Sequence, residues 1–361
     1  MNILFALPGL HLVPRGAESA FENLAQTLAL RGHSVTMVGS GKPKQQTAYH
    51  FMHAPSIARE RLRKLPCFPP VRSDYRWEEL SFAPGLFWTV FGRPFDISIT
   101  CSYPFVHWSL QLALRKTANI FVTENGDWPA RRTNLEYKFF SCNGLVCTNP
   151  EYGERHRERY PTVVIPNGIH PHIFTPGPAT RERFGIPATK KVLLIVSALI
   201  PSKRVADGLR IAALLDDVHV VVAGDGPLRS EIEQLAAEIL PNRFTRLTCQ
   251  ATEMPDLYRS ADALLHMSRE EAFGNIYIEA LSCGLPVIAH DYPTSRWILG
   301  EQGFFGSGDN LQAMAAQVRA ALDAPTTDAN ARHEAVATRF SWDAVAKQYE
   351  AFFSQLLRGK A

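Results

Sequence analysis

The sequence lacks the features that mark membrane, secreted and nucleic-acid-binding proteins. No apolar run approaches the roughly 20 residues that cross a bilayer. The chain begins directly with a strand pattern, so we expect no signal peptide. The formal net charge at pH 7 is only +3, which is too small for the strongly basic face of a general nucleic-acid binder. These absences favour a cytoplasmic protein without a nucleic-acid partner.

The cysteines also lack the spacing of a metal site or a disulfide framework. Six cysteines are scattered along 361 residues, with no C-x-x-C pair and no nearby histidine-rich segment. We expect them to be reduced thiols, as in cytosolic proteins.

The composition that is present is that of a globular α/β protein. Apolar residues make up 46% of the chain and charged residues 20%, and 361 residues are enough for two domains. Residues 2–7 (NILFAL) and 35–38 have strand patterns, and residues 17–30 between them have a helix pattern. This β-loop-α-β unit predicts a parallel sheet of the mononucleotide-binding type.

Polar residues follow a later strand of the same half. Residues 96–100, 119–123 and 139–146 are further predicted strands, as are residues 247–251 in the second half. Glu124, Asn125 and Asp127 come directly after residue 123. Ligands bind at the carboxyl ends of parallel strands. Asn125 could therefore bond a hydroxyl group of a ligand and Glu124 or Asp127 could orient a nucleophile, although Asn-Gly also suits a plain turn.

The stretch that organises the second half is residues 268–291, SREEAFGNIYIEALSCGLPVIAHD. We expect a strand, a loop carrying Glu271, a helix over residues 275–282 and a second strand. Gly274 allows close approach of a ligand, and the helix N-terminus offers free N–H groups to a phosphate. Glu271 and Glu279 would then grip the hydroxyl groups of the same ligand.

The pattern E-x-F-G-x-x-x-x-E-A followed by C-G-x-P-V resembles the donor-binding signature of retaining GT-B glycosyltransferases of the family 4 type. The resemblance covers nearly the whole chain. It implies two Rossmann-like doubly wound domains facing across a cleft, with a C-terminal helix crossing back to the first. We place an acceptor-binding domain at residues 1–165, a nucleotide-sugar-binding domain at 166–338 and the crossing helix at 339–361.

In that family the first glutamate contacts the donor sugar and the second contacts the ribose, which implies these roles for Glu271 and Glu279. The backbone between them, at Phe273, Gly274, Asn275 and Ile276, would receive the diphosphate. By the same resemblance the diphosphate would also be bound by Lys203 and by the backbone of Gly16, and the base would stack near Thr252.

The sequence departs from the family pattern at two positions. A histidine common near the reacting sugar falls here on Glu124 or Asn125, and an arginine that clamps the diphosphate is replaced by Ala198. Arg204 could compensate for that arginine only by pointing differently. The loss of one guanidinium removes a bidentate phosphate contact.

The resemblance implies a retaining hexosyltransferase that uses a nucleotide-diphosphate sugar as co-substrate and needs no other cofactor. The acceptor is a glycan, a lipid-linked sugar or a small molecule. No D-x-D pair occurs, so we predict no metal requirement. A nucleotide-sugar-binding protein without catalysis and a GT-B epimerase are the alternatives. The basic run at residues 59–64 (RERLRK), near Tyr75 and Trp77, is either a membrane-surface contact or a solvated helix face.

Overall fold

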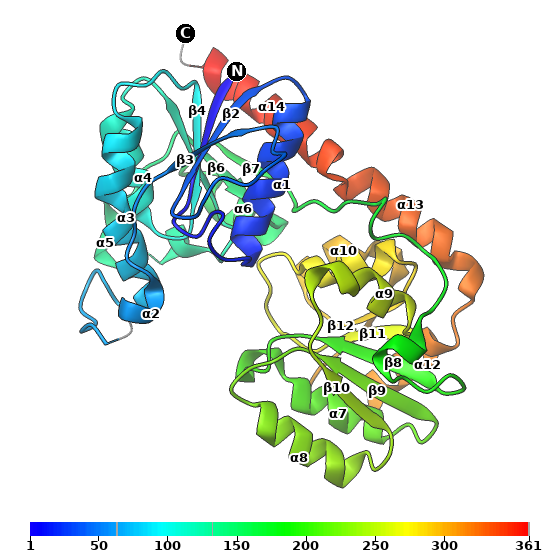
Figure 1. Cartoon of the computed structure of the whole chain (residues 1–361). Helices are drawn as coiled ribbons and strands as arrows, with labels where there is room; N and C mark the ends of the chain where they lie inside the picture. The colour runs from blue at the N-terminus through cyan, green and yellow to red at the C-terminus, as the bar shows by residue number, and fades with distance from the viewer. Residues whose placement is uncertain (63, 132, 360–361) are drawn as a thin grey trace. The chain divides into compact units, whose positions relative to one another are not determined.

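The computed structural model describes residues 1–62, 64–131 and 133–359, and the chain forms two compact units (Figure 1). Unit 1 comprises Met1–Gly168 with Trp342–Ala361, and unit 2 comprises Ile169–Ser341. The sequence prediction had placed these divisions at residues 166 and 339. Arg63, in the predicted basic run, and residues 360–361 of the predicted crossing helix lie outside the described residues.

Unit 1 is built on a parallel sheet. Its described residues form seven strands in the order β3-β2-β1-β4-β5-β6-β7. The strands are β1 (Asn2–Ala6), β2 (Ser34–Gly39), β3 (His50–His53), β4 (Ile97–Cys101), β5 (Ala118–Val122), β6 (Gly144–Cys147) and β7 (Thr162–Val164). Strands β4, β5 and β6 are buried along their whole length, because helices cover both faces of such a sheet.

The helices of unit 1 include one from the far end of the chain (Figure 1). They are α1 (Gly16–Leu30), α2 (Arg59–Leu62), α3 (Asp74–Val90), α4 (Pro104–Ala113), α5 (Leu135–Lys138), α6 (Pro150–His156) and α14 (Trp342–Arg358). From α14, Tyr349 and Phe353 enter the same core as Phe21 of α1. Arg31, which ends α1, donates to both carboxylate oxygens of Glu350 at 2.9 and 2.8 Å.

Unit 2 also carries a parallel sheet with helices on its faces. Its described residues form six strands in the order β10-β9-β8-β11-β12-β13. The strands are β8 (Lys191–Val196), β9 (Val218–Ala223), β10 (Phe244–Leu247), β11 (Ala263–His266), β12 (Val287–His290) and β13 (Gly303–Gly306). The helices are α7 (Val205–Ala213), α8 (Arg229–Ile239), α9 (Met254–Arg259), α10 (Asn275–Ser282), α11 (Pro293–Leu299), α12 (Leu311–Leu322) and α13 (Ala329–Phe340).

Some local predictions were wrong at the edges of elements. We expected a strand over residues 139–146, but β6 begins only at Gly144. The chain leaves helix α5 only at Lys138 and first bonds β5 at Asn143, whose N–H donates to the carbonyl of Asn119. A strand expected at residues 247–251 is instead β10, which ends at Leu247. Helix α3 was not predicted.

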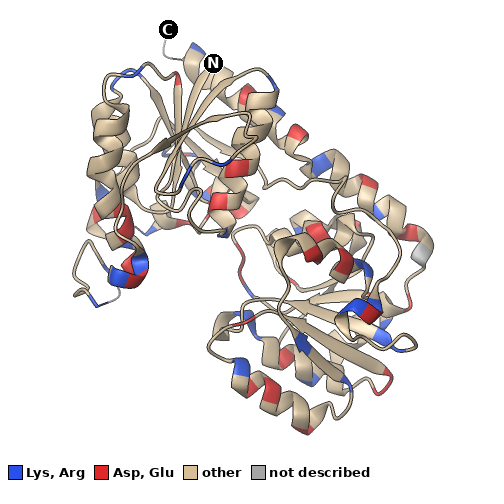
Figure 2. Cartoon of the chain, in the orientation of Figure 1, with Lys and Arg blue, Asp and Glu red and all other residues tan. Residues whose placement is uncertain are grey.

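Both signs of charge are distributed over both units (Figure 2), in agreement with the small net charge of +3. Among the described residues, no helix combines the length and apolar character needed to cross a membrane. From the predicted basic run, Arg59 donates to Asp74 at 2.9 Å and lies over the ring of Tyr75, 3.7 Å from its centroid.

Candidate functional sites

Each sheet has one point where the strand order reverses, and polar residues gather at both. In unit 2 the reversal lies between β8 and β11, and in unit 1 between β1 and β4. At such a point the connections that follow the two adjacent strands run in opposite directions. This opens a crevice at the carboxyl ends of the strands, where ligands bind. The two crevices are therefore the first places to look for function.

A three-residue cluster lies at the carboxyl ends of β8 and β11 in unit 2. Lys203 ends the short helix η3 (Pro201–Lys203) after β8, and His266 is the last residue of β11. Both contact Glu271 in the loop that follows β11. Lys203 forms an ion pair with Glu271 Oε1, and His266 Nε2 lies 2.7 Å from the same oxygen. Because a carboxylate can only accept, His266 Nε2 donates this bond.

The cluster fixes Glu271 as an anion. Burial alone would raise its pKa, but the hydrogen bond from His266 and the charge of Lys203 outweigh burial and lower the pKa to about 2. Glu271 therefore offers only acceptor oxygens at neutral pH, which suits the hydroxyl groups of a ligand. Lys203 supplies a positive charge beside them.

Helix α10 begins next to this cluster. Gly274 immediately precedes it with φ +92°, a left-handed conformation, and a Cβ at that position would lie 2.8 Å from the ring of Tyr277. Asn275 and Ile276 in the first turn are partly exposed. The first N–H groups of a helix have no carbonyl partner within the helix itself, which suits them to an anion. Phe273 differs, because its ring is buried against Trp297 and Phe340 and only its backbone is available.

Glu279 lies further along α10 and is partly buried. Its Oε2 accepts a hydrogen bond of 2.7 Å from the hydroxyl of Tyr258, a residue of α9. Burial raises the pKa of Glu279, and the bond from Tyr258 opposes that rise. The two glutamates of the signature thus have opposite pKa shifts, and the ionised form is stabilised at Glu271.

Two other predicted donor contacts lie apart from the cluster. Arg204 donates to Asp207 at 2.7 Å and to the carbonyl of Gly308 at 2.8 Å, so its guanidinium is directed toward the loop after β13. Thr252 is exposed in the short helix η4 (Ala251–Glu253).

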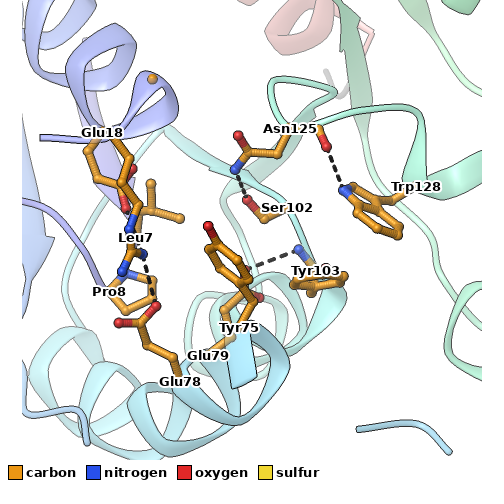
Figure 3. Close-up of a pocket in the computed structure, with 12 residues that line it drawn as sticks. Leu7, Pro8, Glu18, Tyr75, Glu78, Glu79, Ser102, Tyr103, Asn125 and Trp128 are labelled. Atoms are coloured by element: carbon orange, nitrogen blue, oxygen red, sulfur yellow. Dashed lines mark hydrogen bonds and ion pairs between the residues drawn. The ribbon is translucent and has the colours of Figure 1, made fainter. Parts of the chain in front are cut away.

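Unit 1 contains a cavity of about 380 Å³ at its own switch point (Figure 3). Leu7 and Pro8 reach it from the end of β1, Ser102 and Tyr103 from the end of β4, and Asn125 from the end of β5. The remaining lining residues are Arg15, Gly16, Glu18, Tyr75, Glu78, Glu79 and Trp128. Its volume lies within the range of about 300–1,000 Å³ that small-molecule sites occupy.

Three buried carboxylates and one guanidinium line this cavity. Arg15 Nη1 donates to Glu78 Oε2 at 3.0 Å and lies 3.5 Å from Glu18 Oε1. Glu79 Oε1 accepts the backbone N–H of Tyr103 at 3.2 Å. Burial raises the pKa of Glu18, and it raises the pKa of Glu79 well above the ordinary value. The arrangement resembles a polar small-molecule pocket with fixed hydrogen-bonding groups.

The structure separates the three polar residues predicted after β5. Asn125 lines the cavity and donates to the hydroxyl of Ser102 at 2.6 Å. Glu124 accepts a bond of 2.6 Å from Asn167, and burial raises its pKa to about 7. Asp127 lies elsewhere, with its carboxylate 2.5 Å from both His156 and Arg155 on α6.

Gly16 has room around it in unit 1. It is the first residue of α1 and lines the cavity, and a Cβ added there would meet nothing within 4 Å. The protein's own packing therefore does not require glycine at this position. Open space around a glycine is expected where a ligand approaches the backbone closely.

Several site residues were missed from the sequence. His266 stands at the end of an apolar strand, and the only available signal was its proximity to Glu271 five residues later. Glu78 and Glu79 belong to the unpredicted helix α3, and Glu78 meets Arg15 across 63 residues of sequence. The signal for that pair was only a charged segment beside Tyr75 and Trp77.

Comparison with known families and proteins agrees with this architecture. The family profile described as Glycosyl transferases group 1 matches residues 178–337, and that described as Glycosyltransferase Family 4 matches residues 14–173. A D-inositol 3-phosphate glycosyltransferase of Mycolicibacterium smegmatis is 29% identical over 66% of this chain, and one of Thermobispora bispora is 34% identical over 54%. The chain spans about half the length of these curated relatives, 59% and 50% respectively.

Solved structures share the fold over almost the full chain. Sucrose-phosphate synthase from Thermosynechococcus elongatus superposes with a TM-score of 0.80 and 18% identity, covering 99% of each chain. Anabaena HepE in complex with UDP and glucose superposes with a TM-score of 0.77 and 18% identity, covering 98% of this chain and 100% of that one. At this identity the likeness establishes the fold.

Proposed function

Because this chain belongs to the GT-B glycosyltransferases of the family 4 type, we propose that it transfers a hexose from a nucleoside diphosphate sugar to an acceptor hydroxyl. Unit 2 binds the donor and unit 1 binds the acceptor. The acceptor is a glycan, a lipid-linked sugar or a small molecule. The names of the curated relatives add a phosphorylated cyclitol to the small-molecule candidates.

The cluster of Lys203, His266 and Glu271 beside the N-terminus of α10 carries this proposal. A nucleoside diphosphate sugar combines an anionic diphosphate with a neutral, hydroxyl-rich ring. The ammonium of Lys203 and the N-terminus of α10, at Asn275 and Ile276, suit the diphosphate. The ionised Glu271 suits the sugar hydroxyls, and His266 holds that carboxylate in place.

The other predicted contacts complete the donor site in this proposal. Glu279 accepts a hydrogen bond from a ribose hydroxyl while it remains bonded to Tyr258. The nucleotide base stacks near the exposed Thr252. Phe273 contributes its backbone. Gly16 lies in unit 1 with open space around the N-terminus of α1, and its predicted contact with the diphosphate stays a prediction.

The chemistry of the transfer is stabilisation of a departing diphosphate. Lys203 and the α10 amides are fixed before the reaction, so they stabilise developing negative charge without reorganising. We propose that the transfer retains anomeric configuration and that the departing phosphate oxygen takes the proton of the attacking hydroxyl. Asn125 and Glu124 position the acceptor, and Asp127, held by His156 and Arg155, orders the loop that carries them.

We propose that the reaction needs no metal ion. The described residues contain no group of three or more His, Cys, Asp or Glu side chains placed to hold one. Lys203 and the N-terminus of α10 take that role. Activity that disappears with EDTA and returns with manganese would contradict this part of the proposal.

A protein that binds the donor without turning it over is the second candidate. Ala198 removes one expected guanidinium, and Arg204 is held by Asp207 and the Gly308 carbonyl. A GT-B epimerase is a third, and it would change the sugar while it is bound to the nucleotide.

Product analysis distinguishes these candidates. The protein is incubated with UDP-, GDP- and ADP-sugars, with and without a panel of saccharide acceptors, and the products are followed by NMR. A transferase releases nucleoside diphosphate and forms a glycoside whose anomeric configuration equals that of the donor. Binding without release supports the non-catalytic candidate, and a new nucleotide sugar supports the epimerase. Glu271→Gln should abolish transfer, while Glu301→Gln, at an exposed position of unit 2, should not.

A further inference from the structure

Acidic side chains outnumber basic ones around the cavity of unit 1. Of the described residues that line it, three are carboxylates, namely Glu18, Glu78 and Glu79, and Arg15 is the one cation. Each of the three carboxylates is only 3% exposed. An anionic ligand would therefore approach fixed acceptor oxygens in a site where water screens little.

The groups that could attract an anion are already engaged. Arg15 is bonded to Glu78 and lies beside Glu18. Glu18 itself stands in the first turn of α1, so a carboxylate of the protein already neutralises the positive end of that helix.

The guanidinium groups near the cavity are also committed elsewhere. Arg59 is paired with Asp74, and Arg76 is paired with Glu136 in the interior. Arg131 lies over the ring of Trp128, outside the lining of the cavity. If one of these guanidinium groups were to bind a phosphate, it would first have to break its ion pair or cation–π contact.

One buried oxygen of a residue that lines the cavity lacks a partner among the described residues. Glu79 Oε1 accepts the Tyr103 amide, but Glu79 Oε2 is buried without any hydrogen bond. A buried polar atom left in this state costs free energy, and a ligand that bonds it recovers that cost. The partner must donate a hydrogen bond to the carboxylate oxygen or, where Glu79 is protonated, accept one from its O–H. A hydroxyl group can do both.

The rest of the lining also suits a ring that bears hydroxyl groups. Tyr75, Tyr103 and Trp128 supply flat apolar surface, while Ser102 and Asn125 supply neutral polar groups (Figure 3). Ser102 has φ +74°, which a non-glycine residue adopts at a cost and which occurs preferentially at functional sites. Aromatic walls with a few fixed polar groups are typical of small-molecule sites.

We propose that this cavity takes a carbohydrate acceptor, a sugar or cyclitol ring, that carries hydroxyl groups but no phosphate or other anionic group within the cavity. The inference rests on the proposed function and narrows its acceptor class. Glu79 binds one hydroxyl through Oε2. Glu18 and Glu78, with Arg15 between them, exclude a phosphate.

Binding of matched ligand pairs tests this assignment. Dissociation constants of D-glucose, D-mannose and myo-inositol, each beside its monophosphate, are measured by ligand-observed NMR on the full chain. We expect at least one neutral compound to bind, and its monophosphate to bind at least about tenfold more weakly. Glu79→Gln should weaken the neutral ligand about tenfold. Glu154→Gln, an exposed glutamate of unit 1 paired with Arg157, is the control and should change nothing.

A second variant tests the exclusion of phosphate directly. Glu78→Gln removes the charge that holds Arg15, so the discrimination against the monophosphate should shrink. Thermal unfolding shows whether each variant is folded, and Tyr75→Leu, at a partly exposed position, replaces Glu79→Gln if that variant is not.

Two results would overturn the assignment. One is a monophosphate that binds as tightly as its neutral form, and the other is the failure of every neutral compound to bind. Nucleoside diphosphate sugars are titrated into the same samples. If the nucleoside diphosphate sugars bind but the monophosphates bind more tightly than the neutral carbohydrates, only this inference fails. If they do not bind, the proposed function fails as well.

Discussion

The ion cluster of unit 2 leads to a prediction about stability and pH. Glutamine at position 271 keeps the size of the side chain and an oxygen that accepts from His266, but it removes the charge that pairs with Lys203. The pKa of Glu271 is lowered from 4.5 to about 2 in the folded protein. At about 1.4 kcal/mol for each pKa unit, this gives an upper bound of roughly 3 kcal/mol for the stabilisation by the ionised carboxylate.

The direction of the pH dependence follows from the lowered pKa. A carboxyl whose pKa is lower in the folded state stabilises fully above its unfolded value and loses that contribution as pH falls toward the folded value. The wild type should therefore be more stable than Glu271→Gln by about 1–3 kcal/mol at pH 7, and less than half of that difference should remain at pH 3.

Urea unfolding at both pH values measures this difference, with Glu301→Gln as the control. Glu301 is exposed in the same unit, and its substitution should change stability by less than about 0.5 kcal/mol. Equal stabilities of the two variants at pH 7 would refute the reasoning. A difference that stays constant down to pH 3 would do so too, because it would then arise from packing and not from charge.

The remaining predictions concern the glycines and the crossing helix. Gly274→Ala should destabilise unit 2 by about 1 kcal/mol or more, since φ is +92° and Tyr277 blocks the new Cβ, whereas Gly16→Ala should leave the melting temperature nearly unchanged. Differential scanning calorimetry measures the melting temperature of both alanine variants. An equal loss in the two would contradict the different backbone requirements of Gly274 and Gly16. Phe353→Ala should cost unit 1 about 3–5 kcal/mol. Hydrogen exchange should then show faster exchange in α1 and β1, and faster exchange only within unit 2 would count against α14 as part of the core of unit 1.

The donor-site helix shows what sequence reasoning can reach. The expected bounds of residues 275–282 are those of α10, because Gly274 marks its start and the Cys-Gly-Leu-Pro segment marks its end in the sequence itself. Both are local signals. The parallel sheet followed similarly from alternating strand and helix patterns.

The missed parts of the sites depend on contacts between distant residues. His266 gains significance only because the loop after β11 returns Glu271 to it. The acceptor cavity depends on α3 bringing Glu78 to Arg15, and the segment before α3 has prolines and no clear period. Asp127 shows the opposite case. It follows the predicted strand, but Arg155 and His156 of α6 bind its carboxylate, and nothing local in the sequence reveals them.

Isothermal titration of nucleoside diphosphate sugars into the protein tests the central claim most directly. The claim is that the switch point of unit 2 binds the donor through Lys203, Glu271, Glu279 and the N-terminus of α10. One nucleotide class should bind, and Glu279→Gln should weaken it about tenfold through the lost charged hydrogen bond to ribose, while Glu301→Gln leaves it unchanged. No binding of UDP-, GDP- or ADP-sugars, or equal affinity in Glu279→Gln, would contradict the claim.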